Sequence, residues 1–169
     1  MTLQGLPWIA AGDARLLVLG TMPGAASLRL QQYYAHPRNQ FWRIAFAALA
    51  GTDPASYPER VALILKQRVA LWDVLETCVR EGSLDARIEP GSERPNDILA
   101  FLRQHSGVGA VALNGGKAAR LFRSLVLPKL GSLGRPLVVL PMPSTSPAHT
   151  IPFATKLDAW MAAFATLDE

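Results

Sequence analysis

The chain has 169 residues, half of them hydrophobic and 18% charged, so it can bury a sizeable core, and we expect a single domain spanning residues 1–169. No apolar run approaches the roughly 18 residues that cross a bilayer, and no basic N-terminal region leads into a hydrophobic stretch, so we expect a cytoplasmic protein with no membrane partner. The net charge of +4 is compatible with an anionic partner without identifying one, and the single cysteine, Cys78, excludes an intramolecular disulfide and Cys-rich zinc sites.

Four short apolar runs predict strands, and apolar residues at helical spacing between them predict helices. In chain order we expect a strand at 16–20, helices at 40–50 and 57–67, a strand at 68–72, a helix at 95–105, a strand at 109–113, a helix at 116–125, a strand at 137–141 and a helix at 150–166. The stretch 79–95 is expected to be the longest polar loop. Strands that alternate with helices imply right-handed crossovers. The predicted fold class is therefore α/β, a three-layer α/β/α sandwich around a central four-stranded, mostly parallel sheet.

Each predicted strand ends in a polar or turn-forming cluster. These clusters are 20–24, Asp73, 114–117 and 143–149. In open parallel sheets, ligands bind in the crevice outside the carboxyl ends of the strands. The four clusters therefore predict one binding site at this edge of the sheet.

The segment 32–42 brings aromatic and amide side chains close behind the first strand. Tyr33 and Tyr34, near Asn39, offer a stacking plane and edge-reading groups that suit a flat heterocycle, although half-buried loop aromatics are the commoner outcome. Phe41 and Trp42 begin a helix and are expected in the core.

Other catalytic patterns find less support. The three histidines, His36, His105 and His149, lack metal-ligand spacing, so we predict neither a metal nor a cofactor. We expect His105 to end a helix, and we expect the other two either to touch a ligand or to line the loops. The turn at 114–117 lacks the residue pattern of a P-loop. Ser144 or Ser146 with His149 and Asp73 can form a triad only in principle, because triad members need no sequence proximity.

Four segments together resemble the uracil-DNA glycosylase superfamily, most closely its hypoxanthine-DNA (deoxyinosine) glycosylase branch. They are Gly20-x-x-Pro-Gly24, Tyr33-Tyr-Ala-His-Pro-x-Asn-x-Phe-Trp42, Asn114-Gly and Pro143-Ser-Thr-Ser-Pro147. The resemblance implies a four-stranded three-layer fold and hydrolysis of the N-glycosidic bond of a deaminated base flipped out of damaged DNA. It implies hypoxanthine as the preferred base, with uracil and xanthine as further candidates.

The resemblance also implies roles for individual residues. Mismatch-specific uracil glycosylases carry their catalytic Asn where this chain has Met22, and the catalytic Asn of the hypoxanthine branch maps to Asn39, which would orient water. Tyr34 matches the base-stacking aromatic, and either Asp73 or Asn114 would read the base edge. The expected base-binding residues are Thr21, Met22, Pro23, Gly24, Tyr34, Asp73, Asn114 and His149, and the expected DNA-binding residues are Ser144, Thr145, Ser146 and Pro147.

Two other functions stay open at this point. Because Met22 stands where mismatch-specific uracil glycosylases carry their catalytic Asn, the chain also fits a catalytically silent module that binds nucleotides or damaged DNA. The modest net charge permits an enzyme that acts on free nucleosides. For the DNA glycosylase we expect a monomer, because a small enzyme that bends DNA needs an unobstructed rim.

Overall fold

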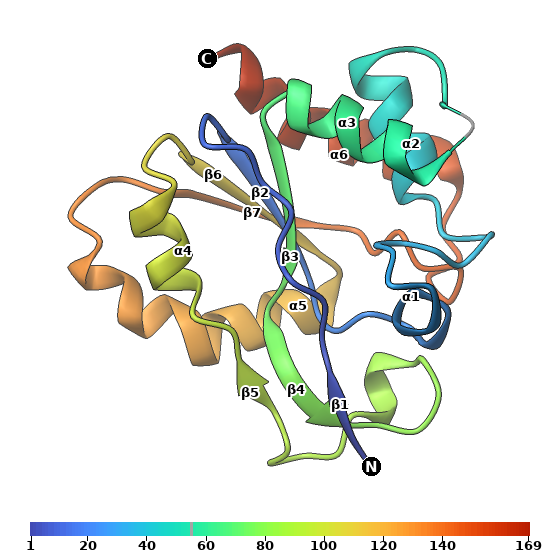
Figure 1. The fold of residues 1–169 in the computed structure, drawn as a ribbon, viewed down its shortest axis with the longest axis vertical. Helices are drawn as coiled ribbons and strands as arrows, with labels where there is room; N and C mark the ends of the chain where they lie inside the picture. Colours follow the sequence, from blue (N-terminus) through green and yellow to red (C-terminus); the bar gives the residue numbers. More distant parts are fainter. Residues whose placement is uncertain (55) are drawn as a thin grey trace.

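The computed structural model describes residues 1–54 and 56–169, and its centre is a four-stranded parallel sheet between two layers of helices (Figure 1). In chain order the elements are β1 (Thr2–Gln4), β2 (Leu16–Gly20), α1 (Ala25–Leu30), α2 (Phe41–Leu49), α3 (Tyr57–Lys66), β3 (Val69–Asp73), β4 (Leu75–Val79), η1 (Asp85–Arg87), β5 (Arg94–Pro95), α4 (Ile98–Gln104), β6 (Ala110–Asn114), α5 (Gly116–Leu121), η2 (Phe122–Val126), η3 (Leu127–Ser132), β7 (Val138–Met142), α6 (Phe153–Ala165) and η4 (Thr166–Asp168). The strand order is β3-β2-β6-β7, and all three pairings are parallel. The predicted fold class is confirmed.

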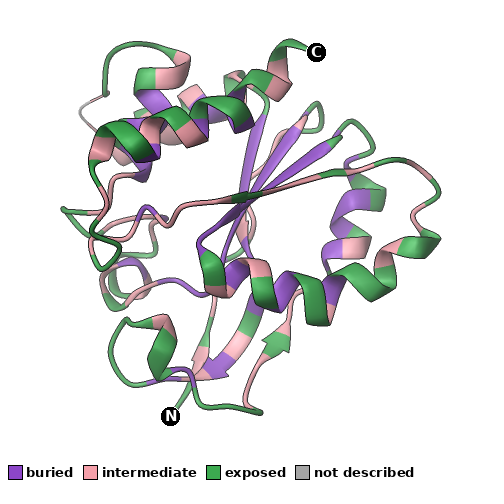
Figure 2. Ribbon diagram, turned by 180° about the vertical axis from the view of Figure 1, so that it is seen from behind, coloured by how far each residue is buried: buried purple, intermediate pink, exposed green. Residues whose placement is uncertain are grey.

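Apart from the partly exposed edge strand β7, the strands of the parallel sheet are largely buried on both faces, which explains why they are near-continuous apolar runs. Leu17 and Leu19 of β2 point into the cluster covered by α4 and α5, whereas Leu16 and Val18 point into the cluster covered by α2 and α6. Figure 2 shows these strands buried and the outward helix faces exposed. Phe41 lies in the second cluster, as predicted. This rigid sheet holds the loops at its carboxyl edge.

Some element predictions are wrong in detail. The short helix α1 and a second, antiparallel sheet of order β1-β4-β5 were not predicted from the sequence. Part of this sheet and η1 lie in the region predicted as a polar loop. Its strands are very short or partly exposed, so they lack the continuous apolar run that identifies the strands of the parallel sheet. The helix expected at 95–105 begins at Ile98, because Pro95 belongs to β5 and the Asp97 carboxylate accepts the Ala100 N–H at 3.0 Å as the N-cap.

The other helix ends differ by a few residues. The helix expected at 116–125 is α-helical only to Leu121 and continues as the π-helical turn η2. The helix expected at 150–166 begins at Phe153, after Pro152. Among the described residues, no helix is long and apolar enough to cross a membrane.

Candidate active site

A cavity of about 660 Å³ opens at the carboxyl ends of β2, β3 and β6. Segments distant in the sequence meet there, as the switch-point rule for parallel sheets predicts. The cavity lining includes every residue that the sequence analysis placed at the site: Thr21, Met22, Pro23, Gly24, Tyr34, Asn39, Asp73, Asn114, Ser144, Thr145, Ser146, Pro147 and His149.

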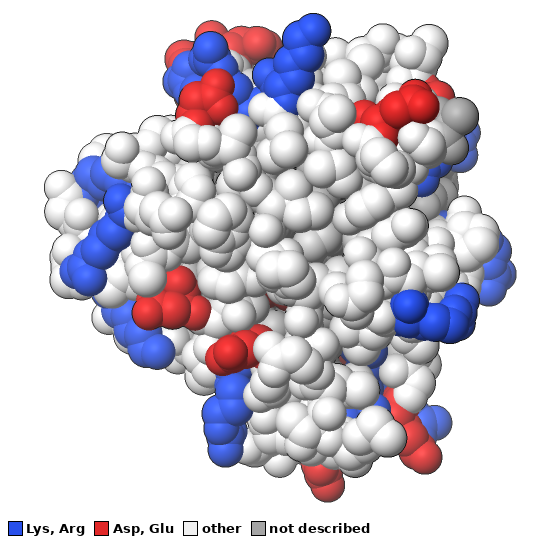
Figure 3. Space-filling model, viewed as in Figure 1, with Lys and Arg blue, Asp and Glu red and all other residues white. Residues whose placement is uncertain are grey.

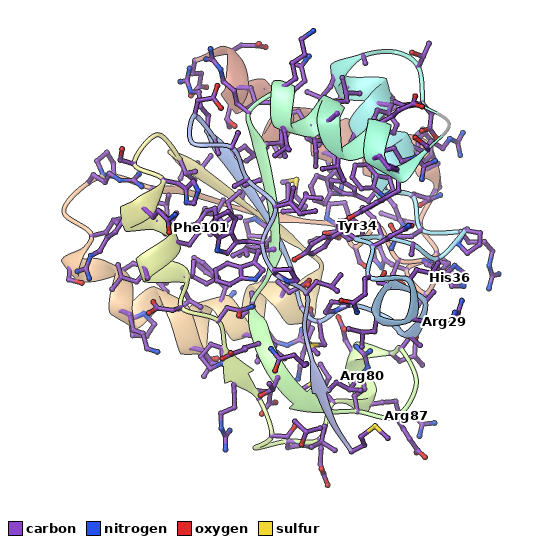
Figure 4. All side chains as sticks on the ribbon, in the orientation of Figure 1. Arg29, Tyr34, His36, Arg80, Arg87 and Phe101 are labelled. Carbon is purple, nitrogen blue, oxygen red and sulfur yellow. The ribbon has the colours of Figure 1, made fainter. Side chains whose placement is uncertain are left out.

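The Tyr34 ring forms one wall of this cavity. Its backbone has φ 55°, in the left-handed region that a bulky residue rarely adopts. The ring stacks on Phe41 with centroids 4.2 Å apart, and its hydroxyl accepts a hydrogen bond from Asn114 Nδ2 at 3.3 Å. In Figure 4, Tyr34 lies toward the middle of the molecule, and His36 lies on the outer side. Packing therefore holds the ring in place despite an unfavourable backbone conformation.

Tyr33, the other tyrosine of this segment, belongs to the core. It is buried, its hydroxyl donates to the Pro7 carbonyl at 2.8 Å, and its own carbonyl accepts from Trp42 Nε1 at 2.9 Å. Both tyrosines contribute to the cavity lining, but Tyr33 is almost fully buried and tied to the core, so Tyr34 is the better candidate for stacking.

Asn39 lies in the loop just before α2. Its Oδ1 accepts the Phe41 N–H at 2.9 Å, and its own N–H donates to the His36 carbonyl at 2.9 Å. Within the described part of the chain its Nδ2 makes no hydrogen bond. The side chain is thus oriented by one bond and keeps an amide group free at the cavity.

Asp73, at the end of β3, provides an unpaired carboxyl group at the bottom of the cavity. It is only 4% exposed, and its Oδ2 has no hydrogen-bond partner among the described residues. Burial, followed by the nearby Asp85 carboxylate, raises the pKa of Asp73 to about 7, while Arg80 acts in the opposite direction. A Cβ on Gly20 would lie 2.4 Å from Asp73 Oδ1, so any larger residue at position 20 would displace the Asp73 carboxyl group. A buried carboxyl without a partner in a cavity marks a candidate ligand contact.

Asn114 uses its side chain to hold the 143–149 loop. Its Oδ1 accepts the Thr145 N–H at 3.0 Å, and its Nδ2 donates to Thr145 Oγ1 at 3.0 Å. The Thr145 carbonyl in turn accepts the Gln40 N–H at 3.0 Å. Thr145 is therefore buried, and the hydroxyls that this loop keeps near the surface are those of Ser144 and Ser146.

Replacing Asn114 by alanine is expected to destabilise the fold by about 2–3 kcal/mol, because the buried Thr145 N–H and hydroxyl lose their partners. Urea unfolding measures this loss. Asn96→Ala, which removes one side-chain bond to the Asp73 carbonyl at 2.9 Å, serves as the comparison and should cost less. Equal losses would contradict a structural role of Asn114 in holding the loop.

A second wall of the cavity, formed by residues 83–86, was not predicted from the sequence. The buried Arg80 guanidinium ties this segment to the first turn by donating to the Pro23 carbonyl at 2.7 Å. Ser83 Oγ accepts the Ala25 N–H at 2.8 Å, and Asp85 faces the cavity near Thr21. No local pattern in the sequence indicates these long-range contacts.

Charge on the surface is dispersed. On the face shown in Figure 3, Lys and Arg alternate with Asp and Glu around the outline, and much of the middle is uncharged. His149 is exposed at the mouth of the cavity, where its N–H donates to the Ser146 carbonyl at 3.0 Å. This face therefore carries no broad basic patch.

The sequence profile of the uracil DNA glycosylase superfamily matches residues 6–167. The chain belongs to this superfamily. It is 31% identical over 165 residues to a protein of Methanosarcina acetivorans named hypoxanthine DNA glycosylase, and 30% identical over 166 residues to a protein of the same name from Methanosarcina barkeri. Each alignment covers 97% of this chain and 99% of the relative.

The fold comparison agrees with membership of the superfamily. A solution NMR structure of a Methanosarcina acetivorans protein, provisionally named a uracil DNA glycosylase, superposes with a TM-score of 0.80 at 30% identity and covers the whole of both chains. The resemblance found in the sequence motifs is thereby confirmed, both for the superfamily and for its hypoxanthine branch.

Proposed function

We propose that this protein is a DNA glycosylase that hydrolyses the N-glycosidic bond of a deaminated base flipped out of duplex DNA, with hypoxanthine preferred. Two relatives whose alignments cover 97% of this chain carry the name hypoxanthine DNA glycosylase. The observation that carries the proposal is that Tyr34 and Asn39, from the loop before α2, and Asp73, from the end of β3, line one cavity in a member of this superfamily. A cavity of about 660 Å³ is within the usual range for small-molecule sites and suits a nucleobase with its sugar.

In this proposal Asn39 positions the attacking water. An amide is too weak a base to take a proton fully near neutral pH, so it orients water against a sugar that acquires oxocarbenium character. Its Oδ1 is held by the Phe41 N–H, which limits the rotation of the side chain. Departure of the base then drives the reaction. The base leaves with negative charge on its ring, the water adds to the sugar cation, and the proton that the water loses neutralises the departed base.

The first turn is placed to stabilise that charge. The N–H groups of Met22 and Gly24 donate to no other group among the described residues, and both residues line the cavity. The Met22 side chain packs into the core, so this residue would act through its backbone. Each such donor can contribute about 3 kcal/mol to stabilising a developing anion.

Asp73 is the better candidate for reading the base edge. The Oδ1 and Nδ2 atoms of Asn114 are already hydrogen-bonded to Thr145 and Tyr34, whereas Asp73 Oδ2 has no partner among the described residues. An ionised Asp73 accepts the N1–H of hypoxanthine, a hydrogen that adenine lacks. The deaminated purine would therefore be distinguished by a buried acceptor.

Replacing Tyr34 by alanine is expected to weaken binding to deoxyinosine DNA about 10-fold more than binding to undamaged DNA, since stacking of one base contributes about 1–3 kcal/mol. Fluorescence anisotropy with an uncleavable deoxyinosine analogue measures both affinities. Tyr34→Phe keeps the ring and loses only the bond from Asn114, so it should bind as the wild type does. Equal losses on both DNAs would mean that Tyr34 only supports the loop.

Mass spectrometric detection of the free base tests the proposal as a whole. Release of hypoxanthine from a deoxyinosine duplex is expected. A duplex that is bound and left intact would instead indicate a silent binding module, and release from the free nucleoside alone would indicate a nucleoside hydrolase.

A further inference from the structure

Lys156 is a buried lysine that the proposed mechanism leaves without a role. It lies in the first part of α6, its side chain is 1% exposed, and its Nζ donates to the Ser146 carbonyl at 3.2 Å. No carboxylate among the described residues forms an ion pair with it. A buried ammonium without a counter-charge is costly, so its presence calls for an explanation.

The ammonium lies directly behind the 143–149 loop. This loop is held on the same side by Trp160 Nε1, which donates to the Pro143 carbonyl at 2.9 Å, and from other directions by Asn114 and the Gln40 N–H. Lys156 is therefore one of several fixed supports of the loop, and it is the one that carries charge.

The opposite side of the loop lines the cavity through Ser144, Ser146 and Pro147. The Ser146 N–H donates to Ser144 Oγ at 3.1 Å, and the Ala148 N–H donates to Ser146 Oγ at 3.2 Å. Each hydroxyl accepts one bond from the backbone and keeps its own hydrogen to donate. Hydroxyl donors of this kind suit a phosphate oxygen.

We propose that Lys156 is a positioning residue whose buried positive charge is the counter-charge for a DNA phosphate bound by the Ser144 and Ser146 hydroxyls, on the side of the 143–149 loop that faces the cavity. The protein supplies the cation and the nucleic acid supplies the anion. The inference rests on the proposed function, because DNA is the anion that this function brings to the loop. A phosphate at this position lowers the energy of the charged lysine and is itself attracted through a thin, partly desolvated layer of protein.

This pairing links DNA binding to protonation. Burial lowers the pKa of Lys156. The elements around it carry the titratable or charged groups His149 of the loop, Arg43 of α2 and Asp158 of α6, and none of these three contributes to the shift, whose cause is burial. A bound phosphate raises the pKa again, so binding takes up a proton, and affinity falls as the pH rises above the pKa of the free protein.

Calorimetry of the wild-type protein tests this linkage directly. Binding to a duplex with a tetrahydrofuran abasic analogue is measured from pH 7.5 to 9.5 in two buffers of different ionisation enthalpy. Proton uptake that grows with pH is expected. Binding without proton uptake across this range would overturn the proposal and leave the glycosylase function untouched. If the wild-type protein released no base, the glycosylase function itself would be refuted.

The Lys156→Met variant provides the second measurement. It removes the charge at nearly the same volume, so the fold should be as stable as the wild type or more stable. Affinity for the duplex at pH 7.5 should fall about tenfold, and the pH dependence should disappear. Lys129→Met removes the same charge from an exposed site on η3 and should change affinity far less. Equal affinities of the two variants would contradict a specific role for Lys156.

Discussion

Replacing Asn39 by alanine is expected to reduce single-turnover base excision at least about 100-fold, because misplacing a reactant by even a small distance costs this much. The side chain lines the cavity, one of its atoms is fixed by the Phe41 N–H, and its Nδ2 is free to hold water. Alanine removes that group without enlarging the core. Affinity for the duplex should change little, since Asn39 acts on water and not on the DNA backbone.

The same substitution also removes a hydrogen bond at the start of α2, which costs about 1 kcal/mol of stability. Ser56→Ala controls for this effect, because Ser56 Oγ accepts the Glu59 N–H at 3.3 Å as the N-cap of α3 and lies outside the cavity. Thermal unfolding should show similar small losses for both variants. If Asn39→Ala kept a near-normal rate, or if Ser56→Ala lost activity to the same extent, the assignment of Asn39 would fail.

Asp73→Asn is expected to stabilise the protein and impair excision. The pKa of Asp73 is raised from 3.8 to about 7 in the folded protein, so the folded state holds a proton that the unfolded chain has already released. Stability contributed by this group is therefore lost as the pH rises from about 4 through 7. At pH 9 the Asp73→Asn variant should therefore have a free energy of unfolding up to about 4 kcal/mol higher than the wild type, and at pH 4 the two should be almost equally stable. Urea unfolding at the two pH values measures the difference.

Excision should respond to pH in the opposite sense. If the ionised carboxyl accepts the base N1–H, the wild-type rate rises with pH and levels off above about pH 7. Asp73→Asn should lack this rise and should be about 10- to 100-fold slower at pH 8. Asp158→Asn, the same change at an exposed position of α6, should leave both the rate and the stability unchanged. A variant at Asp73 that kept the wild-type pH profile would rule out the carboxyl as the base reader.

The sequence predicted the central sheet well for a physical reason. Strands buried on both faces, such as β2 and β6, are apolar at every position, and this pattern is hard to mistake when turn formers bound it. The same topology indicated where the site lies, because the carboxyl ends of parallel strands share one edge. The placement of Asn39 and Tyr34 at the cavity followed from those two facts and the motif resemblance.

The sequence could not predict the features that depend on single long-range contacts. The wall at 83–86 is fixed by the Arg80 bond to the Pro23 carbonyl, and nothing local distinguishes Arg80 from a surface arginine. The proposal that Asp73 rather than Asn114 reads the base edge likewise rests on which side chain is already engaged, and this depends on the folded structure. The burial of Lys156 was likewise invisible, since lysine in an amphipathic helix usually faces solvent.

Single-turnover incubation with labelled duplexes, each containing one deoxyinosine or one uracil, tests the central claim most directly. Alkali converts abasic sites to strand breaks, and Asn39→Ala is run alongside the wild type. We predict strand cleavage at deoxyinosine, slower or no cleavage at uracil, and loss of cleavage in the variant. A folded wild-type protein that binds both duplexes and cleaves neither would contradict the account.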